Sequence, residues 1–252
     1  MTVETCGTGQ PMVLIAGNGG GTAFWSGLAG SLAVHFKLIA FDYRDAPKRD
    51  AHGALFETAE RKADDIGALL DTMDIPAAII LGHSTGAQAA ARFAAAAPQR
   101  VVRLVFSGGF LQAGPYVDAC MQLRKSILET LGPSAFLLDG LFRAVPPEKL
   151  FHQLETDGPD ALLAFREAPD PVIEAERIDA IRTGDIAAIA PTLSVPTSVV
   201  HARDDSVFPF QLGDDVAAAI PNSDFIEIEE GGHLAPMMAP DVYGQAILKE
   251  LT

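Results

Sequence analysis

Three segments that lie far apart in the sequence carry side chains that together could activate a hydroxyl group for attack on a carbonyl carbon. They are the turn Gly82–Gly86 (GHSTG), an acidic loop with Asp204 and Asp205, and the ending Gly231–His233 (GGH). A serine hydroxyl is a weak nucleophile near neutral pH, so it needs a base such as histidine, and the base needs an acid to orient it. Along the chain these candidates follow the order serine, aspartate, histidine.

Ser84 follows an apolar run and precedes an alanine-rich stretch, which indicates a strand, a sharp turn and a helix. In that context G-x-S-x-G describes a strained turn that lifts the serine hydroxyl clear of the backbone. Bulk two residues before or after the serine would clash, which explains Gly82 and Gly86. The amide of Thr85, at the helix N-terminus, is expected to donate to an oxyanion. His83 is interpreted as structural, and a turn with an inert serine is the alternative.

His233 is the candidate base, and an aspartate of the loop after Thr197–His201 is the candidate acid. Both loops follow predicted parallel strands, so their side chains should reach the same edge of the sheet. The chain has only six histidines, so a histidine at the end of the GGH segment is harder to explain by chance. A metal site built from His201, Asp204, Asp205 and His233 is disfavoured because these residues lack a compact ligand spacing.

The elements that must position these residues follow an α/β pattern. Nearly continuous apolar runs predict strands covered on both faces, at Met12–Ala16, Lys37–Phe41, Ala77–Leu81, Val101–Phe106, Thr197–His201 and Phe225–Ile228. Helical stretches are predicted between the first four, at Thr22–Val34, Thr58–Met73 and Thr85–Ala97. This alternation predicts a doubly wound, mostly parallel sheet with right-handed crossovers.

The alternation stops after the fourth of these strands. Residues 112–190 hold no convincing strand and instead contain helical pieces punctuated by prolines. We therefore expect an α/β core made of residues 1–111 and 191–252, with a helical cap insertion at 112–190. Such an insertion should lie over the carboxyl ends of the strands, where open parallel sheets bind ligands.

Composition narrows the classes of function. The 252 residues carry a formal net charge of −15, which argues against a nucleic-acid partner. No run is long and apolar enough to predict a membrane span, and the first residues lack the pattern of a secretory signal. The two cysteines, Cys6 and Cys120, make no disulfide framework, so a cytoplasmic location is expected. The expected partner is a small-molecule substrate, and the chain could be a monomer or a homodimer.

The motifs together resemble those of the α/β-hydrolase family, and the resemblance covers essentially the whole chain. The acidic loop is similar to the family's Gly-x-x-Asp-x-x-x-Pro, with Ala202 in place of the usual glycine. That alignment implies that Asp205 is the orienting acid, with Asp204 as the alternative, and that His233 is the base. Where relatives commonly read Asp-x-Arg-Gly-x-Gly-x-Ser, residues 42–49 lack both glycines, which implies a differently shaped loop.

The resemblance also indicates an oxyanion loop and a pocket. Residues 13–21 are similar to the family's strand and glycine-rich turn, with alanine in place of histidine at position 16. By position Asn18 supplies the second oxyanion amide, or else Gly19 does. Trp25 falls where relatives often place a bulky residue near the pocket, although a core tryptophan is equally expected. Phe110, in the loop after the fourth predicted strand, either lines the pocket or belongs to a small core of the cap.

The resemblance implies a serine hydrolase that acts through an acyl-enzyme and needs no cofactor or metal. The modest cap is similar to those of enol-lactonases, small carboxylesterases and aminoacrylate or amide hydrolases, which implies a small ester, lactone or related carbonyl substrate. Carbon–carbon hydrolysis of a diketone from aromatic degradation is an alternative, although such relatives usually carry an aromatic residue where Leu234 follows the histidine. Cofactor-free oxidation, or a small-ligand receptor that retains the triad, remains open because a fold does not fix a function.

Overall fold

A computed structural model describes residues 2–42, 58–158 and 169–251; most of the loop at 42–49 discussed above lies outside these ranges. The described residues form a seven-stranded sheet in the order β1-β3-β2-β4-β5-β6-β7. Its strands are β1 (Val3–Cys6), β2 (Gln10–Ile15), β3 (Phe36–Phe41), β4 (Ala78–His83), β5 (Val101–Ser107), β6 (Thr197–Ala202) and β7 (Asp224–Ile228). Only β1 runs antiparallel to its neighbour, so the predicted mostly parallel sheet is confirmed.

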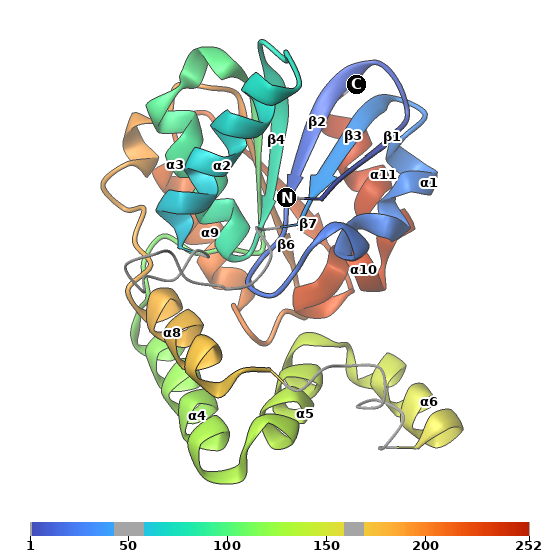
Figure 1. Cartoon of the computed structure of the whole chain (residues 1–252), viewed down its shortest axis with the longest axis vertical. Helices are drawn as coiled ribbons and strands as arrows, with labels where there is room; N and C mark the ends of the chain where they lie inside the picture. Colours follow the sequence, from blue (N-terminus) through green and yellow to red (C-terminus); the bar gives the residue numbers. More distant parts are fainter. Residues whose placement is uncertain (1, 43–57, 159–168, 252) are drawn as a thin grey trace.

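Helices cover both faces of the sheet (Figure 1). One face carries α2 (Ala59–Thr72), α3 (Thr85–Ala96) and α9 (Phe210–Ala219), and the other carries α1 (Ala29–Leu32), α10 (Ala235–Met238) and α11 (Pro240–Leu251). The central strands β4 and β6 are buried along their whole length, because each is covered on both sides. The expected helix at Thr22–Val34 is in fact a 3₁₀ segment, Thr22–Leu28, followed by the single turn of α1.

Between β5 and β6 the chain builds a group of helices at one end of the sheet (Figure 1). They are α4 (Pro115–Leu131), α5 (Pro133–Ala144), α6 (Pro147–Asp157) and α8 (Pro171–Arg182). Each begins with a proline, a residue that suits the first helical position because the amide it lacks would have no partner there. Four of the prolines in this part of the sequence therefore start helices. No helix within the described ranges is long and apolar enough to span a bilayer.

This helical group is joined to the sheet end through a shared apolar cluster. Phe110 follows β5 and Phe208 follows β6, and both are buried with Val117 and Met121 of α4 and Ile178 of α8. The rings of Phe110 and Phe208 meet edge to face with their centroids 4.8 Å apart. The loops that leave the carboxyl ends of β5 and β6 are thus packed directly beneath the helices that follow β5.

Candidate active site

Ser84 lies in the sharp turn between β4 and α3. Its φ of 57° and ψ of −124° confirm the strained conformation that the sequence predicted. A Cβ at position 82 would overlap the backbone of Gly86, and a Cβ at position 86 would overlap the carbonyl oxygen of Ile15. Both glycines are therefore required by close backbone approach, as expected. Ser84 is buried, with 9% of the residue exposed.

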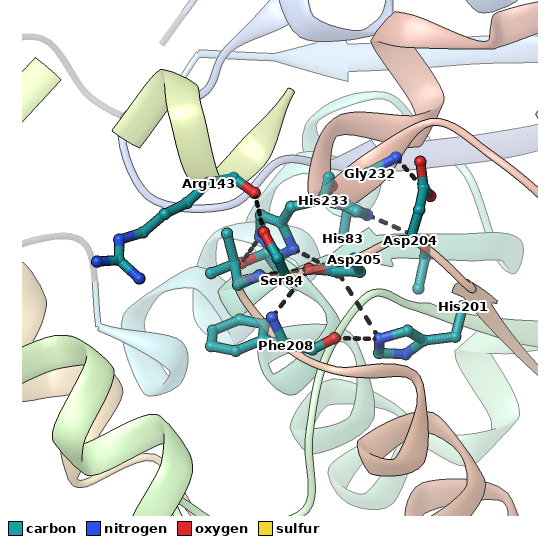
Figure 2. A network of polar contacts seen from close by, with 12 residues as sticks. His83, Ser84, Arg143, His201, Asp204, Asp205, Phe208, Gly232 and His233 are labelled. Atoms are coloured by element: carbon teal, nitrogen blue, oxygen red, sulfur yellow. Dashed lines mark hydrogen bonds and ion pairs between the residues drawn. The ribbon is translucent and has the colours of Figure 1, made fainter. Parts of the chain in front are cut away.

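The three candidate catalytic side chains come together at the carboxyl ends of β4, β6 and β7 (Figure 2). His233 Nε2 lies 3.1 Å from Ser84 Oγ, and His233 Nδ1 lies 2.8 Å from Asp205 Oδ2. Because a carboxylate only accepts, Nδ1 carries the proton and donates it to Asp205. Nε2 is then left as an acceptor for the Ser84 hydroxyl. This geometry suits proton removal from Ser84 by a base that a buried carboxylate holds in place.

Asp205 is almost completely buried and is held on both oxygens. Its Oδ1 accepts from the amides of Val207 and Phe208, each at 2.9 Å, while Oδ2 faces His233. Burial alone raises the pKa of Asp205, but the neighbouring His233 and His201 and these hydrogen bonds outweigh burial and hold the pKa below its ordinary value. Asp205 therefore stays ionised at neutral pH, as an orienting acid must.

Asp204, the alternative acid, faces the backbone of the histidine loop instead (Figure 2). Its Oδ1 accepts from the amide of Gly232 at 2.8 Å and its Oδ2 accepts from that of Gly231 at 3.1 Å. Both glycines have a positive φ, 134° at Gly231 and 63° at Gly232, so the loop depends on residues without a side chain. The two neighbouring aspartates thus contact different parts of one loop: Asp205 contacts the imidazole of His233, and Asp204 fixes the turn that presents it.

A buried chain of hydrogen bonds leads from α11 to the backbone of His233. Tyr243 donates to Ser107 Oγ at 2.7 Å, Ser107 Oγ lies 3.0 Å from His83 Nδ1, and His83 Nε2 lies 2.7 Å from the His233 carbonyl oxygen. Since a carbonyl only accepts, His83 Nε2 carries the proton and Nδ1 accepts from Ser107. Every group in the chain is satisfied with a neutral His83.

Burial is the main cause that lowers the pKa of His83 to about 3, with the charge of His233 acting in the same direction. His83 is therefore neutral across the physiological range. Its ring turns away from the Ser84 hydroxyl and stacks on Phe24 with centroids 5.3 Å apart. The structural interpretation of His83 is confirmed. His201 is likewise packed: it is buried, donates through Nε2 to the Phe208 carbonyl at 2.7 Å, and has a pKa lowered mainly by burial.

The candidate oxyanion loop is a tight turn beside Ser84. The amide of Gly20 donates to the Gly17 carbonyl at 3.2 Å, and Gly19 has a φ of 70°. A positive φ at the third position is what a type II turn requires, and such a turn leaves the amide of its second residue, Asn18, unused. A Cβ on Gly17 would lie 3.3 Å from Ser84 Oγ, so the turn passes close to the nucleophile. The amide of Thr85 is one of the first in α3, where amides have no helical partner.

The two candidate pocket residues have different surroundings. Phe110 is fully buried against Phe208, and the Phe208 ring in turn meets the His233 ring edge to face with centroids 5.0 Å apart. Trp25 is buried in a core cluster, with its ring centroid 4.7 Å from that of Phe24 and 6.5 Å from that of His83. The structure therefore places Phe110 behind Phe208, whose ring borders the imidazole, and places Trp25 next to His83. Among the residues described, no group of His, Cys, Asp or Glu could hold a metal ion.

Comparison with known proteins agrees with this architecture. A family model described as alpha/beta hydrolase fold matches residues 10–240. A protein of Azorhizobium caulinodans named "Putative carbamate hydrolase RutD" is 27% identical over 97% of this chain and 92% of its own length. The enol-lactonase of Burkholderia xenovorans superposes with a TM-score of 0.83 at 22% identity, covering 99% of this chain and 95% of its own. A malate-bound thermophilic esterase of Thermogutta terrifontis gives 0.79 at 24% identity, covering 99% and 92%.

Proposed function

The chain belongs to the α/β-hydrolase fold family, and from that premise we propose that it is a serine hydrolase whose nucleophile is Ser84. The observation that carries the proposal is the continuous chain of contacts from Asp205 through His233 to the Ser84 hydroxyl, at 2.8 and 3.1 Å. Family membership and the names of its relatives support hydrolase activity in general. The residue roles and the bond that is cleaved are our proposal.

In the proposed reaction His233 Nε2 takes the proton from Ser84 as Oγ attacks the carbonyl carbon of the substrate. The resulting oxyanion accepts hydrogen bonds from the amides of Asn18 and Thr85. Each such donor contributes roughly 3 kcal/mol in comparable enzymes. His233 then gives the proton to the leaving group, which departs and leaves an acyl-enzyme. Water, deprotonated by the same imidazole, releases the acid and restores Ser84.

We propose a small ester, lactone or related carbonyl compound as substrate. The apolar cluster of Phe110 and Phe208 supports a small apolar acyl group, because the Phe208 ring packs edge to face against the imidazole of His233. A carbamate is the second candidate, favoured by the name of the relatives that cover almost the whole chain. A carbamate presents the same kind of carbonyl carbon, so the same residues would attack it, and the two candidates differ in the group that leaves.

The test combines turnover with covalent labelling. We expect the wild type to hydrolyse short-chain p-nitrophenyl esters, and the Ser84→Ala variant to lose about 10⁴-fold or more in kcat while keeping its fold. A fluorophosphonate probe should label Ser84 and no other serine. Near-normal turnover by Ser84→Ala, or an active protein in which Ser84 stays unlabelled, would overturn the assignment.

A panel of matched substrates then distinguishes the bond. Esters, lactones and N-alkyl carbamates with the same small acyl size should be compared by kcat/KM, each with Ser84→Ala as the blank. A clear preference for carbamates would move the second candidate to first place. Tight binding of a substrate without turnover would instead favour a small-ligand receptor that retains the triad.

A further inference from the structure

A buried lysine lies behind the candidate oxyanion hole. Lys62 is on α2 and its side chain is 0% exposed, although lysine is almost never fully buried in proteins. Placing an ammonium group in a protein interior costs free energy unless it is well hydrogen-bonded. A long apolar side chain at position 62 would be buried at a lower cost in free energy. The contacts that Lys62 makes therefore call for a functional explanation.

The ammonium group of Lys62 contacts the side chains of both residues whose amides are proposed to bind the oxyanion. Nζ donates to Asn18 Oδ1 at 3.1 Å and to Thr85 Oγ1 at 3.2 Å. Thr85 Oγ1 donates in turn to Asn18 Oδ1 at 2.8 Å. The three groups close a triangle that joins α2, the turn after β2 and the first residue of α3.

This triangle fixes the turn that carries the Asn18 amide. The oxygen of the Asn18 side chain accepts from two donors, and its Nδ2 donates to the Arg177 carbonyl of α8 at 3.5 Å. A side-chain amide held at both ends cannot turn over, so the backbone of Asn18 is held between α2, α3 and α8. The hydroxyl of Thr85, held by the same lysine, keeps the other amide in register with it.

We propose that Lys62 is a positioning residue of the oxyanion hole, which holds the Asn18 and Thr85 amides at the geometry of the tetrahedral oxyanion. The inference rests on the proposed function, since it gives the lysine a part in that reaction. The proposed role does not require Lys62 to contact the substrate, because the lysine is wholly buried.

The test replaces Lys62 with methionine, which has a similar length and no charge. We expect kcat of Lys62→Met to fall roughly 10- to 100-fold, less than or equal to the loss of one oxyanion donor, with KM within about twofold. The inhibition constant of 1,1,1-trifluoro-2-butanone, which forms a tetrahedral oxyanion on a reactive serine, should rise in parallel with the loss in kcat/KM. Lys249→Met, which removes an exposed charge from α11, is the matched control and should be unchanged.

Two further variants keep the inference testable if Lys62→Met folds poorly. Lys62→Gln retains one neutral donor and should have an intermediate kcat, and Thr85→Val keeps the backbone amide while removing the hydroxyl that Lys62 contacts. We expect Thr85→Val to lower kcat in the same way, and the double variant with Lys62→Gln to lose less than the product of the two single losses. Fully multiplicative losses, or a folded Lys62→Met with wild-type kcat, would overturn the inference.

The same measurements separate this inference from the proposed function. If Ser84→Ala abolishes turnover while Lys62→Met keeps the wild-type kcat and inhibition constant, the nucleophile stands and only the role of Lys62 is wrong. If Ser84→Ala retains normal turnover, the proposed function itself fails, and the role of Lys62 fails with it.

Discussion

Replacing Asp205 with asparagine should disable the base without disturbing the fold, because the surrounding backbone amides determine how the new side chain is oriented. The amides of Val207 and Phe208 both donate to Asp205 Oδ1. In the variant the carbonyl oxygen of the asparagine must take that position, because an NH₂ group there would face two donors. The NH₂ group is then forced toward His233 Nδ1, where it donates a hydrogen bond.

That donation selects the wrong tautomer of His233. With Nδ1 accepting, the proton moves to Nε2, and Nε2 can no longer accept the proton of Ser84 Oγ from 3.1 Å. An equivalent change in a comparable triad lowers kcat about 10⁴-fold, or about 5 kcal/mol of transition-state stabilisation. Loss of the negative charge of Asp205 from its buried hydrogen bond with His233 should change the free energy of unfolding by only about 1–3 kcal/mol.

Asp204→Asn is the matched control, since it makes the same chemical change one residue away. Its carboxylate accepts from the amides of Gly231 and Gly232, whereas the imidazole donates to Asp205, so the imidazole keeps its tautomer. One of those amides would face the new NH₂ group, which should cost about 1 kcal/mol of stability and lower kcat less than tenfold.

The assay is p-nitrophenyl acetate turnover of both variants at pH 8, with thermal unfolding followed on the same samples. An Asp205→Asn variant within tenfold of wild type would refute the tautomer argument. A large loss in Asp204→Asn with a small one in Asp205→Asn would transfer the orienting role to Asp204.

Two further predictions concern stability. Burial lowers the pKa of His83 from 6.5 to about 3, so between these pH values the unfolded chain binds a proton at His83 and the folded chain does not. The contribution of neutral His83 to the free energy of unfolding is therefore complete above pH 6.5 and is lost as the pH falls toward 3. Between pH 3 and 6.5 the free energy of unfolding, measured by urea denaturation, should change with pH by about 1.4 kcal/mol per pH unit less in His83→Gln than in wild type. Equal slopes in the two proteins would contradict the lowered pKa of His83. Phe110→Ala should cost about 3–5 kcal/mol, because the ring is fully buried against Phe208. A loss below about 1 kcal/mol in the same measurement would show that this cluster does not hold the end of the sheet together.

The core of the fold was readable from the sequence because its strands are buried on both faces. Such strands are continuous apolar runs, and each of the six predicted strands lies within one or two residues of its observed bounds. The expected helix at Thr22–Val34 was wrong in kind, since its first seven residues form a 3₁₀ segment. Its apolar residues are placed mainly by packing against α10 and α11 rather than by helical periodicity, and that packing is not visible in one sequence.

The site was readable where backbone geometry dictates residue type. Ser84 with its two glycines is such a case, because the strained turn tolerates no other residues at those positions. The choice between Asp204 and Asp205 depends on which carboxylate faces the imidazole, and adjacent residues in a loop give no sequence signal for that. Lys62 did leave a signal: it occupies the apolar face of α2, four residues before Ile66 and seven before Leu69, where a lysine is out of place.

Contacts of the helices between β5 and β6 reach three of the loops that carry the proposed chemistry. The Asn18 side chain donates to the Arg177 carbonyl of α8, Ser206 of the acidic loop donates to the Arg143 carbonyl at the end of α5, and a Cβ on Gly232 would lie 2.6 Å from the Ala144 carbonyl oxygen. A substitution that shifts α5 or α8 would therefore also move the oxyanion turn or the imidazole. For this reason we expect changes of substrate preference in these helices to alter kcat together with KM, whereas a cap that only excluded or admitted substrates would alter KM alone.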